Sequence, residues 1–136
     1  MKFELLDAFR KKEHIVDLEL CRVLMEDKEF PWILLVPMRD CVTQMNHLRE
    51  EDAIQLIKEI NISSDIMEEL FETDRLNVAA IGNKTSQLHV HIISRRMMDS
   101  LWPNTVWGQK MATLSDQERD ARASCLRDRF CQKFSV

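Results

Sequence analysis

Two histidines and a glutamine alternate with apolar residues in the segment 87–94, QLHVHIIS. Strict alternation predicts a β-strand with one buried face, because every second side chain of a strand points the same way. Gln87, His89 and His91 are therefore expected to project from one face, with the two imidazoles side by side. Such a pair can carry chemistry.

The chemistry open to paired imidazoles is broad, because an ordinary pKa of about 6.5 leaves much of each ring neutral at pH 7. One ring can attack an electrophile as the neutral base while the other stabilises negative charge or the leaving group. The amide of Gln87 can add a donor. The plainer alternative is a pair of half-buried histidines with satisfied hydrogen bonds. A zinc site is a third, and it would need a further ligand from His14, His47 or a distant acidic residue.

Composition narrows the class of protein. The chain has 136 residues, of which 45% are hydrophobic, so we expect one domain over residues 1–136. A formal net charge of −4 gives no general attraction to nucleic acid polymers or anionic membranes, which favours a small molecule as the partner. No apolar run approaches the ~18 residues of a membrane span, no signal-peptide pattern opens the chain, and the four cysteines form no CxxC pair. These features predict a cytoplasmic protein with ordinary thiols.

Four β-strands are expected to position the histidines. Apolar runs at 18–25 and 32–37, joined by an acidic turn, predict a hairpin. Two further strands are expected at 76–81 and 88–94, with the pair Gly82-Asn83 opening the turn between them. That turn lies next to the histidines in the sequence.

Three helices complete the prediction. Apolar residues among charges predict a short amphipathic helix over 3–12, and apolar spacings of three and four predict a long covering helix over 49–72, loosened near 61–64. A Ser-x-x-Glu capping box predicts a C-terminal helix over about 115–129.

The segment 87–93, preceded by a strand that ends near Asn83 and followed by Trp102-Pro103, resembles the histidine triad (HIT) superfamily. The motif of that superfamily is three histidines alternating with apolar residues. The apolar segment 33–37, which precedes a long helix, follows the same order of elements, so the resemblance covers about residues 15–108. It implies an α+β fold with a five-stranded antiparallel sheet, a long covering helix and the C-terminal helix as an extension. It also implies a homodimer of bacterial HIT-like type.

Members similar to this chain hydrolyse or transfer nucleotides at the α-phosphate. By position, the resemblance makes His89 the nucleophile that forms a nucleotidyl-histidine intermediate, and His91 the contact to the phosphate or leaving group. Asn83 is then a substrate donor, and the hydroxyls of Thr85 and Ser86 are added as substrate-binding groups. No metal or cofactor is required, because an imidazole supplies the nucleophile.

The chain departs from the pattern at three places, one of them residues 37–40, where many relatives have a lysine and a histidine after the proline. Gln87 replaces the first histidine, so we expect it to act in catalysis through hydrogen bonds alone. Only residues 84–86 separate Asn83 from Gln87, where relatives carry a longer glycine-rich phosphate loop. We therefore predict a hydrolase or transferase acting on a dinucleoside polyphosphate or a nucleoside phosphoramidate. The alternative is a nucleotide-binding module with weak or no turnover.

Other residues near the motif have plain structural interpretations beside the functional ones. Trp102 and Trp107 can stack on a purine, reach over a dimer partner or pack on the sheet. Glu26 and Asp27 lie where relatives bind ribose, but we favour a solvated turn. Met97-Met98 are expected to fill gaps between the sheet and the C-terminal segment.

Overall fold

A computed structural model describes residues 3–134 as a five-stranded antiparallel sheet in the order β1-β2-β3-β5-β4. The strands are β1 (Glu13–Asp17), β2 (Cys21–Met25), β3 (Trp32–Pro37), β4 (Arg75–Ala79) and β5 (Val90–Arg95). The helices are α1 (Asp7–Arg10), α2 (Glu50–Leu70) and α3 (Asp116–Phe134), with one 3-10 turn, η1 (Met45–His47). This is the α+β architecture that the sequence predicts.

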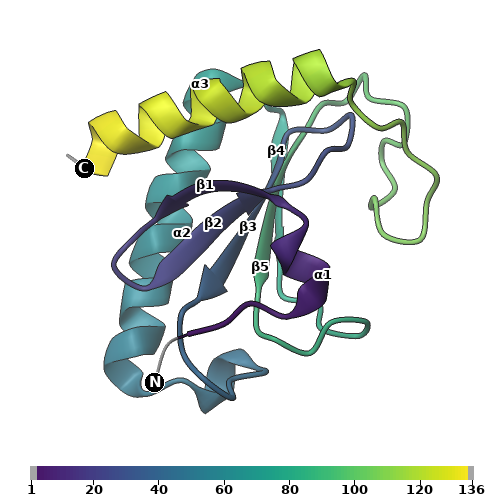
Figure 1. The fold of residues 1–136 in the computed structure, drawn as a ribbon. Coiled ribbons are helices and arrows are strands. Elements are labelled where there is room, and N and C mark those ends of the chain that lie inside the picture. Colours follow the sequence, from purple (N-terminus) through teal and green to yellow (C-terminus); the bar gives the residue numbers. More distant parts are fainter. Residues whose placement is uncertain (1–2, 135–136) are drawn as a thin grey trace.

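Helices α2 and α3 cover one face of the sheet, α2 behind it and α3 across one end (Figure 1). Helix α2 buries Leu56, Ile60 and Met67, whose spacing places them on one stripe toward the sheet. Strands β3 and β5 send Ile33 and Ile92 into the same core. None of the helices within residues 3–134 is both long and apolar enough to cross a membrane.

The opposite face of the sheet carries two smaller hydrophobic clusters. Phe9 of the N-terminal segment packs with Leu24, Leu34 and Val36. A second cluster forms around Trp32, Phe30, Ile93 and Val106, the last of these from the loop after β5. Because strand residues alternate between faces, His91 points to this side together with Ile93. His89 lies directly before β5 and packs on Phe9 of the same side.

Strand β5 lies in the interior of the sheet. It pairs with β3 on one side and with β4 on the other, and His91 is opposite Leu34 in β3 and Ala79 in β4. Backbone hydrogen bonds on both sides fix the histidine strand more firmly than an edge position would. The interior position therefore supports a rigid site.

The N-terminal region differs from the expectation. The helix predicted over 3–12 is only α1, Asp7–Arg10, and residues 13–17 form the unpredicted edge strand β1. The backbone of Glu4 and Leu6 bonds to the side chain of Gln87, so these residues are not free to form a helical turn. A long-range contact thus overrides the local helical pattern.

The other elements match their predictions, with shifted ends. Helix α2 runs unbroken through residues 61–64, where we expected loosening, and α3 continues to Phe134 rather than ending near 129. The capping box is confirmed, because the Glu118 amide donates to Ser115 Oγ at 3.1 Å and the Ser115 amide to Glu118 Oε1 at 3.0 Å. Strand β4 ends at Ala79 and β5 begins at Val90, so the connection between them is longer than expected.

Candidate active site

His89 and His91 lie side by side beneath the two clusters of the open face. Their ring centroids are 4.8 Å apart, with the rings edge to face. Both residues are buried, at 5% and 8% exposure. The neighbouring protein groups therefore determine which nitrogen of each ring carries the proton.

The carbonyl of Gln87 fixes the tautomer of His89. Nδ1 of His89 lies 2.7 Å from the Gln87 carbonyl oxygen. A carbonyl only accepts, so Nδ1 carries the proton and Nε2 presents its lone pair. Burial lowers the pKa of His89 below its usual value, against the opposing effect of the bond to the Gln87 carbonyl. The Ile81 backbone is a further hydrogen-bond partner that raises the pKa of His89, with a smaller effect than Gln87. A neutral ring with a lone pair on Nε2 is the state that a nucleophile requires.

Trp32 fixes the opposite tautomer in His91. Its indole Nε1–H donates to Nδ1 of His91 at 3.0 Å, and an indole can only donate. The remaining nitrogen, Nε2, must therefore carry the proton. Burial, with a smaller contribution from His89, lowers the pKa of His91 to about 3. His91 is accordingly a neutral hydrogen-bond donor near pH 7.

Aromatic rings stand on both sides of the histidines. Phe9 meets the His89 ring edge to face at 4.8 Å between centroids. Trp107 meets His91 in the same way at 5.2 Å. Phe9 and Trp107 belong to opposite ends of the sequence, so the two walls come from the N-terminal segment and from the loop after β5.

These groups enclose a pocket of about 360 Å³. This volume falls within the range of about 300–1,000 Å³ that small-molecule sites occupy. The pocket is lined by Ala8, Phe9, Lys12, Glu26, Trp32, Leu34, Ile81, Asn83, Lys84, Thr85, His89, His91, Trp107 and Gly108. It combines apolar walls with several polar and charged side chains.

The structure brings together four of the six residues that the sequence nominates. Asn83 and Thr85 line the pocket with both histidines. Ser86 lies instead in a neighbouring hollow, which also contains Asn83 and His89. The side chain of Gln87 is outside the pocket, because its Oε1 accepts from the Leu6 amide and its Nε2 donates to the Glu4 carbonyl. The catalytic and binding roles of all six stay predictions.

Three pocket residues were missed or misjudged. Trp32 and Phe9 received no role, although Trp32 begins a strand in which alternate residues face the histidines. Glu26, which the sequence assigns to a solvated turn, is largely buried, pairs with Lys12 and lines the pocket. The ion pair explains the difference, because a carboxylate can be buried when a cation compensates it.

Arg95 anchors the loop that brings Trp107 to the site. It is 1% exposed and binds both carboxylate oxygens of Asp99 through Nε and Nη2, at 2.7 and 3.0 Å. This pairing lowers the pKa of Asp99 to about 2. The guanidinium also faces the ring of Trp102. Trp102 therefore packs within its own chain.

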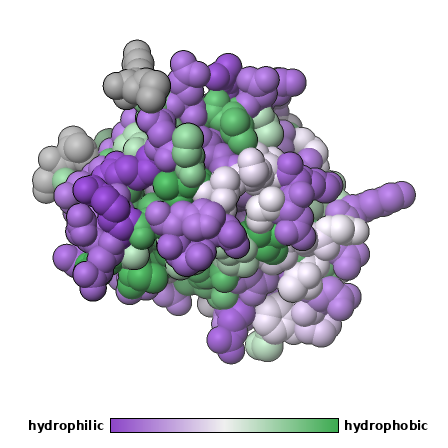
Figure 2. Space-filling view, turned by 90° about the horizontal axis from the view of Figure 1, so that it is seen from below, coloured by the Kyte–Doolittle hydropathy of each residue, from purple (hydrophilic) through white to green (hydrophobic). Residues whose placement is uncertain are grey.

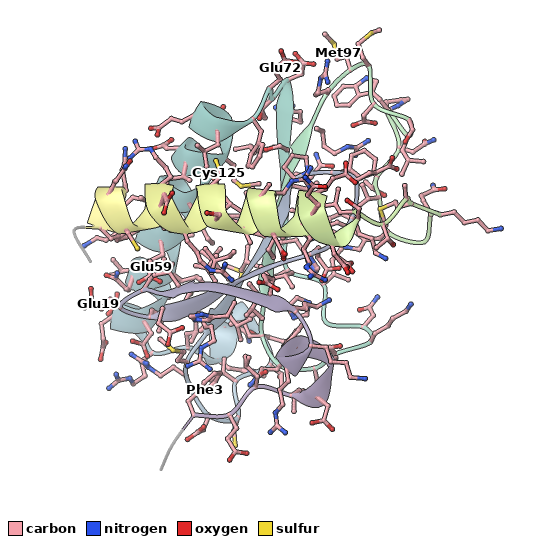
Figure 3. The ribbon with its side chains drawn as sticks, turned by 45° about the horizontal axis from the view of Figure 1, so that its top comes forward. Phe3, Glu19, Glu59, Glu72, Met97 and Cys125 are labelled. Carbon is pink, nitrogen blue, oxygen red and sulfur yellow. The ribbon has the colours of Figure 1, made fainter. Side chains whose placement is uncertain are left out.

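The two methionines after β5 do not fill a gap in the core. Met97 and Met98 are 62% and 85% exposed. Met97 lies beside Glu72 at one end of the molecule, opposite Phe3 (Figure 3). That prediction was wrong, because the loop turns away from the sheet directly after Arg96.

The zinc alternative finds no support among residues 3–134, where no group of three or more His, Cys, Asp or Glu side chains is arranged to hold a metal ion. His14 bonds to Asp17, and His47 contacts Thr43. Neither histidine lines the pocket of His89 and His91.

The five-stranded sheet and its buried histidine pair define a histidine-based α+β domain. Comparison with known proteins identifies its family. The HIT domain family model matches residues 10–98, and the chain belongs to that family. A histidine triad protein from Bradyrhizobium japonicum is 37% identical, with a TM-score of 0.89 over 94% of this chain and 98% of its own. One from Marinobacter aquaeolei VT8 is 31% identical, with a TM-score of 0.90 over 97% and 98%.

More distant similarity supports the fold alone. A hypothetical histidine triad nucleotide-binding protein from Sulfolobus tokodaii is 15% identical, with a TM-score of 0.68 over 87% of this chain and 83% of its own. No curated protein matches the chain.

Proposed function

We propose that the protein is a nucleotide hydrolase or transferase that acts at the α-phosphate through a nucleotidyl intermediate on His89. The observation that carries the proposal is the opposite tautomers of the two rings. The bond to the Gln87 carbonyl leaves a lone pair on Nε2 of His89. The bond from the Trp32 indole leaves a proton on Nε2 of His91, which makes that nitrogen a donor. A nucleophile and a neutral donor thus stand side by side in one buried pocket.

In the first step, Nε2 of His89 attacks the α-phosphorus and the bond to the leaving-group oxygen breaks, so the leaving group departs with the electron pair. The ring then carries positive charge, which strengthens the bond from Nδ1–H to the Gln87 carbonyl. Nε2–H of His91 donates to a phosphoryl or leaving-group oxygen as its charge grows. In the second step, water attacks phosphorus, releases one proton and the mononucleotide, and restores the His89 lone pair.

The pocket offers groups suited to a nucleotide. Asn83, Lys84 and Thr85 line one side and supply an amide, an ammonium and a hydroxyl for phosphate oxygens. They stand in for the longer glycine-rich loop of relatives. Phe9 and Trp107 provide flat apolar surfaces for a base. The substrates we propose are dinucleoside polyphosphates or nucleoside phosphoramidates.

Intact-mass spectrometry tests the mechanism directly. The protein is mixed briefly with diadenosine tetraphosphate or adenosine phosphoramidate and quenched in mild base, because phosphohistidine adducts hydrolyse in acid. We expect an adduct of one AMP in the parent protein and none in His89→Ala. The exposed His47, which does not line the pocket, gives the matched control His47→Gln, in which the adduct should persist.

Three other outcomes separate the alternatives. AMP binding with neither adduct nor AMP release would favour a binding module without turnover. An adduct that survives in His89→Ala would refute the assignment of the nucleophile. Absence of binding by any nucleotide would overturn the proposed function as a whole.

The proposal includes a homodimer, as the family resemblance implies. Strand β4 is an edge of the sheet, and it leaves Val78 45% exposed. Helix α2 also exposes Ile54 and Ile57. An edge strand with free backbone groups can pair with a second copy. Sedimentation velocity at micromolar concentration should give a dimer, and a monomer alone would contradict this part of the proposal.

A further inference from the structure

The N-terminal segment, residues 3–12, forms one wall of the pocket. It contributes Phe9, which is 3% exposed and packs on the His89 ring, and Lys12, which pairs with Glu26. Phe3 (Figure 3) and Leu5 pack against the same cluster as Phe9. The end of the molecule that carries this segment shows apolar patches between polar residues (Figure 2). The pocket is therefore complete only while the segment lies against the sheet.

The side chain of Gln87 holds this segment at two points. Its Oε1 accepts from the Leu6 amide at 3.0 Å, and its Nε2 donates to the Glu4 carbonyl at 2.9 Å. One planar amide thus satisfies a donor and an acceptor of the segment's backbone together. The two bonds cross 81 and 83 positions of sequence, so they act between distant parts of the chain.

We propose that Gln87 is a positioning residue whose side-chain amide anchors the N-terminal segment over the pocket, so that Phe9 confines the nucleotide beside His89. This inference rests on the proposed function and deepens it. The backbone carbonyl of the same residue orients His89. One residue therefore sets both the tautomer of the nucleophile and the wall next to it.

Residue chemistry explains why glutamine suits this position. A carboxylate could accept from Leu6 but could not donate to the Glu4 carbonyl, and it would repel that oxygen. A neutral imidazole has its donor and its acceptor on separate nitrogens of a rigid ring, so it cannot reproduce a planar amide facing two backbone groups. Replacing the first histidine of the motif with glutamine thus gives the position a different task.

The anchor is tested without substrate by hydrogen exchange of the Leu6 amide and by limited trypsin cleavage after the basic residues 10–12. In Gln87→Ala we expect exchange and cleavage to rise about tenfold, which corresponds to about 1.4 kcal/mol. The matched control is Gln132→Glu, a change at an exposed glutamine of α3. An unchanged unfolding temperature in both variants shows that the effect is local.

The near-isosteric variant Gln87→Glu supplies a rescue. At pH 7 its carboxylate lacks the donor, so we expect the Leu6 amide to exchange faster than in the parent. At about pH 4, near the ordinary pKa of a glutamic acid, the protonated carboxyl regains a donor and the protection should recover relative to the parent at the same pH. A merely space-filling side chain would show no such recovery.

Kinetics distinguish an anchor from a group that acts on the transition state. If Gln87 holds the wall, Gln87→Ala should raise KM about tenfold and change kcat by less than about threefold. A fall in kcat with unchanged KM would overturn the inference, because it would mean that the amide contacts the reacting phosphate. So would unchanged Leu6 exchange in Gln87→Ala. The exchange and cleavage results do not depend on turnover, so failure of the proposed function leaves the anchor testable.

Discussion

Removing the indole donor of Trp32 tests the reasoning about His91 most directly. Trp32→Phe keeps an aromatic ring in the cluster but deletes the N–H that binds Nδ1 of His91 at 3.0 Å. Leaving a buried acceptor without its partner costs about 1–3 kcal/mol. The neutral form of His91 loses that stabilisation, whereas the protonated form loses nothing, because its Nδ1 cannot accept.

The cost converts into a change of pKa. At about 1.4 kcal/mol per pKa unit, we expect Trp32→Phe to raise the pKa of His91 by about 1–2. Burial, which is the largest cause of the lowered pKa of His91, remains in the variant. The ring still stays neutral at pH 7. The rate should nevertheless fall about two- to tenfold there, because the Nε2–H tautomer is no longer enforced by a bond worth about 0.5–1.5 kcal/mol.

Nitrogen-15 NMR of the histidine rings across a pH series measures the pKa and the tautomer of each ring. The parent protein should show His89 protonated on Nδ1 and His91 on Nε2 at pH 7. Trp107→Phe is the matched control, because Trp107 also touches His91 but its buried Nε1 has no hydrogen-bond partner within residues 3–134. The reasoning fails if His91 of the parent titrates near pH 6.5 or carries its proton on Nδ1. It also fails if both tryptophan variants shift His91 equally.

Three further predictions concern stability. The pKa values of His89 and His91 are lowered in the folded state, so the unfolded chain takes up protons first as the pH falls. The free energy of unfolding should therefore decrease as the pH drops below about 6.5 toward 3. The decrease is at most about 1.4 kcal/mol per pH unit for each ring. Urea unfolding at pH 7 and pH 5 checks this, and equal stability at both would contradict it. Asp99→Asn leaves the Arg95 charge buried without its counterion and should cost about 3–5 kcal/mol in urea unfolding; a loss below about 1 kcal/mol would mean that the pair is not buried as described. Ser115→Ala should cost about 1 kcal/mol through loss of the helix cap, with the ring tautomers unchanged by NMR.

Hydrophobic alternation, helical spacing and the capping box predicted the elements whose formation depends on nearby residues. Alternation located the face of His89 and His91, and apolar spacing found α2, because a covering helix must bury one stripe. The cap at Ser115 followed from its own four-residue signature. Strand β1 was missed because Ile15 is the only buried residue between Glu13 and Asp17, so the segment carries little signal beyond its pairing with β2.

The details that give the site its chemistry depend on contacts between distant parts of the chain. Trp32 and His91 are 59 positions apart, and only the pairing of β3 with β5 brings them together. Gln87 lies before the start of β5, and local sequence could not show that the segment of Glu4 and Leu6 would occupy its amide. Pairing registers and chain crossings of this kind are set by the whole fold rather than by local sequence.

The two histidines are chemically equivalent in the sequence and become different only through their neighbours. The Gln87 carbonyl, an acceptor, places the proton of His89 on Nδ1, and the Trp32 indole, a donor, places the proton of His91 on Nε2. Neither neighbour titrates in the accessible pH range, so both assignments hold while the fold is intact. If the proposed mechanism holds, the pH dependence of the rate should follow the substrate and the stability of the domain rather than a histidine that titrates near neutrality.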